Sequence, residues 1–296
     1  MPPEDGRLRA LELGSSDDVV VIDRQKNDRS VWLRRGSLSN PAEIVASFSN
    51  HRVAPSDDLS NVGVWRERLG VESDAEMQEW KASLCTENMT WFNDAGPEWR
   101  RLLLGKHDVH AEWRHIPNLN VRLHRVSMVL ESVDAMTAYH AVLQSFGTRH
   151  HFGFGDKSTL DADKIALIDV HSFVMYEIHR IALVGVKDRL FVNVVVSNDE
   201  NLLIASSPIM GSAAEAAVMD ALGERAKKHV IGSSHFYALH FVATAEGCEV
   251  VALVSGDPKG GLLPQLYNTD RVSRAICKGV RGFLLAIHRL ATAYSN

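Results

Sequence analysis

Carboxylate and histidine residues alternate in one stretch of the chain, and such a pattern could bind a metal ion. Asp169 and His171 are two residues apart, and so are Glu177 and His179. On a strand each pair would share a face, whereas on a helix residues two apart point about 200° away from each other. Neither spacing matches HExxH or a comparable zinc motif. We therefore expect no metal ion and no other cofactor.

Two adjacent histidines, His150 and His151, lie in a segment rich in glycine and phenylalanine. Glycine lets a ligand approach the backbone closely, and loops often carry functional residues. These histidines could therefore provide a general base or a binding contact. The alternative, which we favour, is a connecting loop whose phenylalanines pack on the body of the protein.

Four basic residues follow one face of the amphipathic helix that is predicted near the C-terminus. They are spaced three, four and three residues apart, which places them on one stripe opposite the apolar stripe. The basic stripe consists of Arg271, Arg274, Lys278 and Arg281. Such a stripe could bind the phosphates of a nucleic acid or an acidic partner, although most are solvated helix faces. With His150 and His151, these four are the candidate binding residues.

Composition places the chain among soluble globular proteins. Of its 296 residues, 45% are hydrophobic and 23% are charged, which is enough for a sizeable core. The formal net charge of −5 argues against a protein that mainly coats nucleic acid, because neutralising phosphates needs a basic excess. No secretory signal and no membrane-spanning run are visible. Three scattered cysteines indicate reduced thiols, so we expect a cytoplasmic location.

The first half of the chain is predicted to be mainly helical, with short hairpins. Residues 1–16 read as a loose arm, and residues 17–147 form a region rich in tryptophan. Ser73 and Glu76 fit a capping box at the start of a helix. The clustered tryptophans could stack on bases, but their helical spacing favours an aromatic core. A hairpin is predicted over residues 109–130.

The second half, residues 148–296, is predicted to follow an αββαββα order with a mixed sheet. Its first segment, residues 160–184, is apolar nearly all round and favours a buried helix, although a strand with alternating faces remains possible. Strands follow at 191–197 and 202–205. The remaining predicted elements are a helix over 213–229, a hairpin that turns at Glu246 and Gly247, and a long closing helix. The fold class is therefore α+β.

This order of elements, over residues 160–256, resembles the core of the PD-(D/E)xK nucleases. The resemblance implies a magnesium ion held by Glu177 together with Asp188 or Asp199. In that family the next strand carries a glutamate and a lysine. Here that strand reads LIASSP over residues 203–208 and has neither residue. The resemblance therefore implies a related fold that has lost catalysis.

No motif for nucleotide binding or acyl transfer is present, since GxxxxGK[ST], GxGxxG and GxSxG are all missing. We therefore lean against an enzyme and predict a protein that works through its surfaces. The expected function is self-assembly or the binding of another macromolecule, as in a structural subunit of the viral coat or nucleocapsid type. The expected partner is a second copy or another protein, with nucleic acid possible at the basic stripe and no membrane. A degenerate magnesium-dependent nuclease is the alternative.

Overall fold

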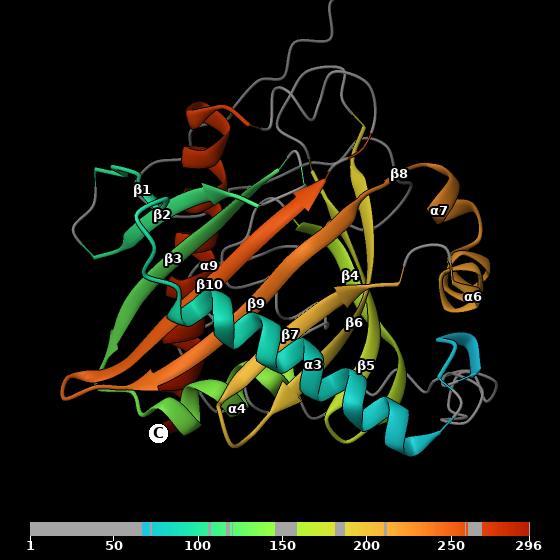
Figure 1. Ribbon diagram of the computed structural model, residues 1–296, viewed down its shortest axis with the longest axis horizontal. Coiled ribbons are helices and arrows are strands. Elements are labelled where there is room, and N and C mark those ends of the chain that lie inside the picture. Colours follow the sequence, from blue (N-terminus) through green and yellow to red (C-terminus); the bar gives the residue numbers. More distant parts are fainter. Residues whose placement is uncertain are drawn as a thin grey trace, which may run out of the picture.

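A large, curved β-sheet organises the protein, and helices cover both of its faces (Figure 1). The computed structural model describes residues 67–71, 73–105, 108–116, 119, 121–145, 159–180, 187–209, 212–257, 259 and 268–295. The strands are β1 (Arg100–Arg101), β2 (His110–His115), β3 (Arg122–Glu131), β4 (Thr159–Asp169), β5 (Ser172–His179), β6 (Arg189–Asn198), β7 (Leu203–Pro208), β8 (Val230–Ile231), β9 (Ser233–Ala243) and β10 (Gly247–Asp257). The helices are α3 (Asp74–Asn93), α4 (Ala135–Ser145), α6 (Ala213–Leu222), α7 (Glu224–Lys227) and α9 (Asp270–Ser295).

The sheet has ten strands in the described residues, in the order β1-β2-β3-β10-β9-β7-β6-β5-β4, with β8 beside β6. Every described pair is antiparallel except β6 with β8, so the predicted mixed sheet is not supported. The α+β class is confirmed. β1, β2 and β3 belong to the same sheet as the later strands, and the mainly helical first half is therefore not supported either.

The division at residue 147 stays a prediction, because the segment around it and the predicted arm lie outside the described residues. The strands on its two sides share one sheet. None of the described helices is long and apolar enough to cross a membrane.

The segment predicted as a buried helix is the β4–β5 hairpin. Its strands pair in antiparallel register, and they are joined through Val170 and His171. All residues of β5 except the last are buried, because both faces of the sheet are covered there. A strand that is buried on both faces shows a continuous apolar run, which looks like a buried helix in the sequence. The helix prediction was therefore wrong; the segment is extended, as in the alternative, but as two paired strands and not as one.

Helix α3 begins as its capping box predicts, with the Ser73 side chain accepting a hydrogen bond from the Glu76 amide over 3.2 Å. It crosses the sheet and contacts β6, β7 and β9 (Figure 1). Its buried residues recur at helical spacing: Met77, Lys81, Cys85 and Asn88. Several tryptophans pack against the same core, among them Trp80, Trp91 and Trp99.

Helix α9 covers the opposite face of the sheet, together with α4 (Figure 1). It contacts β3 and α4. Its predicted apolar stripe is confirmed in the C-terminal half, where Phe283, Leu284, Ile287 and Ala291 are buried. We call the side of the sheet that faces α9 the inner face.

Candidate functional site

One row of residues crosses the inner face from strand to strand, each directly opposite the next. Directly paired residues of an antiparallel sheet project to the same side, so all members share one face. We call this set the central row. Its members are Phe173 (β5), Val195 (β6), Ser206 (β7), Tyr237 (β9), Val254 (β10), His124 (β3) and Trp113 (β2).

The middle of the central row contacts α9. The rings of Tyr237 and Phe283 are 6.5 Å apart between centroids, which joins the middle of the row to the helix. Phe173 and Val195 belong to the same buried cluster as Phe283 and the neighbouring residues of α9. The row is therefore mostly apolar, as expected for a surface between a sheet and a helix.

Two polar side chains interrupt this apolar surface, and each has an atom without a hydrogen-bond partner among the described residues. The Oγ atom of Ser206 and the Oδ1 atom of Asn193 are both unpaired, and each residue is only 2% exposed. Asn193 precedes Val195 by two residues on β6, so it lies on the inner face diagonally from Ser206. A buried polar group without a partner costs about 1–3 kcal/mol. Native proteins keep such groups mainly where a bound molecule or water satisfies them.

A third group of this kind is the imidazole of His124. Its Nδ1 atom lies 3.3 Å from the carbonyl oxygen of Val254, and its Nε2 atom is buried without a partner. Burial, with a smaller contribution from the charge of Arg122, lowers the pKa of His124 to about 4. The ring is therefore neutral near pH 7, and with Nδ1–H donating to the Val254 carbonyl oxygen its Nε2 atom can accept a hydrogen bond.

Charged and polar groups gather toward one end of the inner face, on β4, β5 and the start of β6. Glu177 is 5% exposed, and its Oε2 atom lies 3.2 Å from Nε2 of His179. Arg189 is buried and donates a hydrogen bond to the carbonyl oxygen of Lys259 over 3.1 Å. The ammonium of Lys164 lies 4.3 Å from the Phe173 ring centroid, and burial lowers the pKa of Lys164 to about 8. The inner face thus has an apolar middle and a polar end.

The carboxylates predicted to hold magnesium do not meet. Asp188 and Asp199 flank the two ends of β6, and a ten-residue strand is about 30 Å long. Asp199 accepts a hydrogen bond from the Tyr139 hydroxyl, and Glu177 is paired with His179. The described residues contain no group of three metal-binding side chains. The nuclease alternative is therefore wrong.

The other predicted site residues lie on α9 or outside the described residues. In the basic stripe, Arg271, Arg274 and Lys278 are exposed, whereas Arg281 is paired with Asp108. His150 and His151 lie outside the described residues. Asp169, the first residue of the alternating pattern, forms an ion pair with Lys81 of α3.

The fold is similar to that of StAR-related lipid transfer proteins. It superposes on human StAR-related lipid transfer protein 5 with a TM-score of 0.57 and 12% identity, covering 76% of this chain and 100% of that one. For human STARD10 the TM-score is 0.51 and the identity 14%, covering 76% and 82%. No protein-family model and no curated protein matches the sequence. At such low identity the likeness concerns the fold alone.

This likeness overturns the predicted function. The fold is shared with lipid transfer proteins, and the predicted structural protein of the viral coat or nucleocapsid type is therefore wrong. The predictions of self-assembly and of a protein or nucleic-acid partner are therefore wrong as well. The sequence reasoning missed Ser206 and Asn193. The only available signal was a single polar residue within an apolar strand, such as Asn193 in FVNVVVS.

Proposed function

We propose that this chain binds a lipid, or a similar hydrophobic molecule with a polar end, between the inner face and α9. The observation that carries the proposal is the pair of unpaired polar atoms, Ser206 Oγ and Asn193 Oδ1, buried in an apolar surface. Ligand sites for small molecules are mostly apolar and contain a few polar groups that orient the ligand. The likeness to a protein named for lipid transfer supports the same class of ligand.

The two polar atoms define what the polar end of the ligand must offer. The Asn193 Oδ1 atom accepts a hydrogen bond, and the Ser206 hydroxyl can donate one and accept one. A hydroxyl or an amide group of the ligand satisfies both. The surrounding side chains of Met175, Val195 and Tyr237 would contact its apolar part. The predicted cytoplasmic location of such a carrier stays a prediction.

The experiment begins with the purified full-length chain. Extraction with organic solvent and mass spectrometry would identify lipids that co-purify. Titration with a fluorescent sterol, a fluorescent fatty acid and a fluorescent phospholipid would then show saturable binding of at least one class. If the folded chain neither carries a lipid nor binds any of the three probes, the proposal is wrong.

Variants locate the binding on the inner face. Asn193→Leu and Ser206→Ala should each weaken binding by roughly fivefold to tenfold, because each removes one buried hydrogen bond to the ligand. The matched control is Ser127→Ala, which makes the same change on the other face of the sheet. Equal weakening by Ser127→Ala would contradict a site on the inner face.

A further inference from the structure

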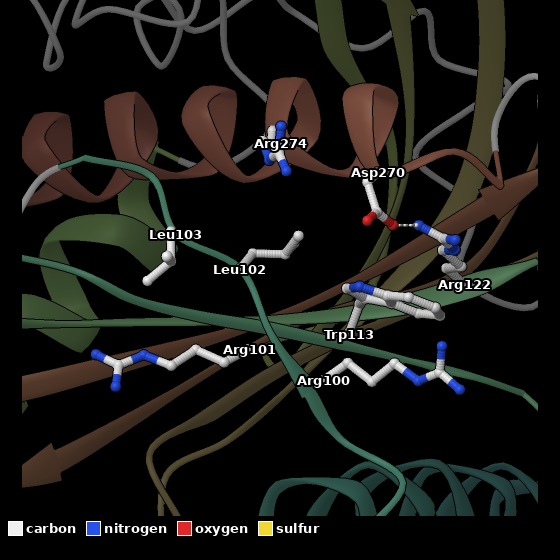
Figure 2. A pocket seen from close by; sticks show the side chains of 8 residues that line it. All are labelled: Arg100, Arg101, Leu102, Leu103, Trp113, Arg122, Asp270 and Arg274. Atoms are coloured by element: carbon white, nitrogen blue, oxygen red, sulfur yellow. Dashed lines mark hydrogen bonds and ion pairs between the residues drawn. The ribbon is translucent and has the colours of Figure 1, made fainter.

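A cavity lies at the edge of the sheet, where β1, β2 and the start of β3 meet the first turns of α9 (Figure 2). Its volume is about 340 Å³. Arginine residues dominate its lining, and we call it the arginine pocket. The lining residues are Arg100, Arg101, Leu102, Leu103, Trp113, Arg122, Asp270 and Arg274.

Arg122 forms the wall of the arginine pocket and is held in place from several sides. Its Nη1 atom donates to Asp270 Oδ1 over 2.8 Å and to Ser273 Oγ over 2.9 Å. Its Cζ atom lies 3.5 Å from the ring centroid of Trp113. The side chain is only 10% exposed, and its Nε atom is buried without a partner. A cation so placed has hydrogen-bonding capacity that the described residues do not use.

Two further arginines of the pocket have no carboxylate partner among the described residues. Arg100 lies over the ring of Trp113, with its Cζ atom 5.3 Å from the centroid, and Arg274 projects from α9. Figure 2 shows Arg100 extending to the side of Arg122, whereas Arg101 extends the opposite way. Arg100 and Arg122 thus both lie over the Trp113 ring, and with Arg274 they line a cavity in whose lining Asp270 is the single carboxylate.

The excess positive charge acts on a neighbouring residue. The pKa of His115 lies below its ordinary value, first because of burial and then because of the charges of Arg122 and Arg100. Its ring packs against Trp113 with centroids 5.3 Å apart. The corner of the sheet is thus a region of positive potential, which attracts anions.

We propose that the arginine pocket binds a phosphate group. Guanidinium groups present planar pairs of N–H donors that match the oxygens of a phosphate, and several of them together compensate its charge. The cavity is larger than a phosphate alone, so it also has room for the group that carries the phosphate. That group would pack on Trp113 and Leu102.

The phosphate could belong to a lipid headgroup or to a soluble phosphate ester. Leu103 lines the cavity and is 78% exposed, which is a suitable contact for the surface of a membrane. Trp113 and Ser206 are four strand spacings apart on the central row, or roughly 19 Å. The arginine pocket is therefore separate from the unpaired polar atoms of the proposed lipid site.

The test uses the full-length chain and two probes. Calorimetry with inorganic phosphate at low salt measures binding of the soluble anion. Co-sedimentation with phosphatidylcholine vesicles, with and without phosphatidic acid, measures binding of the headgroup at a membrane. Binding of phosphate alone identifies a soluble ester as the ligand, and binding that requires phosphatidic acid vesicles identifies a lipid headgroup. Either result supports the pocket, and failure of both probes overturns it.

Substitutions then distinguish binding inside the arginine pocket from general electrostatic attraction to the basic surface. Arg100→Gln and Arg274→Gln should each weaken binding roughly tenfold, because each removes a charged hydrogen-bond donor. Arg271→Gln is the matched control on the same helix, since Arg271 is exposed and does not line the cavity. Its effect should stay within about twofold. Equal weakening by Arg271→Gln and Arg274→Gln would overturn the proposal.

Two further measurements serve as controls for the binding results of these variants. Urea unfolding of each variant shows that the loss of binding does not come from unfolding. The Ser206→Ala variant should bind phosphate as the unmodified chain does. The phosphate proposal and the lipid proposal can therefore fail independently of each other.

Discussion

The hydroxyl of Tyr139 on α4 donates a hydrogen bond to Oδ1 of Asp199 over 2.6 Å, which ties the helix to the turn between β6 and β7. Tyr139 is completely buried, whereas Asp199 is half exposed. Burial raises the pKa of Tyr139 above its ordinary value, and the bond to Asp199 adds to the shift. The hydroxyl thus stays protonated and remains a donor. Asp199 therefore has a structural role.

Tyr139→Phe should lower the free energy of unfolding by about 1 kcal/mol, because it removes this hydrogen bond and keeps the ring. Urea unfolding followed by circular dichroism measures the change. Tyr294→Phe is the matched control, since the Tyr294 hydroxyl bonds to Gln144 at an exposed site where water can replace it. An equal loss in both variants would contradict the importance of the Tyr139 bond.

Two glycines should respond in opposite directions to alanine. Gly247, in the turn between β9 and β10, has φ 151°, and an added Cβ atom would clash with the carbonyl oxygen of Leu130. Gly247→Ala should therefore destabilise the protein by roughly 2 kcal/mol or more. Gly279 lies within α9, where an added Cβ atom meets only open space. Gly279→Ala should stabilise by about 0.5–1 kcal/mol in urea unfolding. A Gly247→Ala variant as stable as the unmodified chain would contradict the turn geometry.

The protein should become less stable as the pH is lowered from 6.5, and this loss should begin above the pH range in which carboxylates are protonated. His124 has a pKa of about 4 in the folded protein, against 6.5 as its ordinary value. Between these values the unfolded chain binds more protons than the folded one. The free energy of unfolding therefore decreases as the pH falls from 6.5 to about 4, by about 3 kcal/mol at most from this residue.

The variant His124→Gln cannot titrate, so it should lose less stability over the same pH range. Urea unfolding at several pH values, for both proteins, measures the difference. The comparison is needed because burial also lowers the pKa of other histidines, namely His115, His229, His235 and His240. If the two proteins lose the same stability between pH 6.5 and pH 4, His124 is not buried in its neutral form.

Removal of the Ser206 hydroxyl should leave the ligand-free protein equally stable, or make it up to about 1 kcal/mol more stable. The hydroxyl is buried without a partner, so its loss removes an unfavourable burial. Ser206→Ala is compared with the unmodified chain by thermal unfolding after delipidation. A clear loss of stability would indicate that the hydroxyl has a structural hydrogen bond.

The sequence alone determined the elements whose pattern is local. The apolar stripe of α9, the capping box at Ser73 and the turn at Gly247 follow from spacings of a few residues, and the structure contains all three. The α+β class followed from them. The β4–β5 hairpin was missed, because its burial on both faces removes the alternation by which a strand is recognised.

Only the tertiary structure decided which residues share a site. Ser206 and Asn193 become neighbours through the register of β6 and β7, and nothing in their local sequence marks them as unpaired. Arg274 was predicted as part of a stripe with its neighbours on α9. It also lines a cavity with Arg100 and Arg122, which are more than 150 residues away in the chain. Local spacing predicts the faces of an element, but long-range strand pairing and helix docking determine which faces meet.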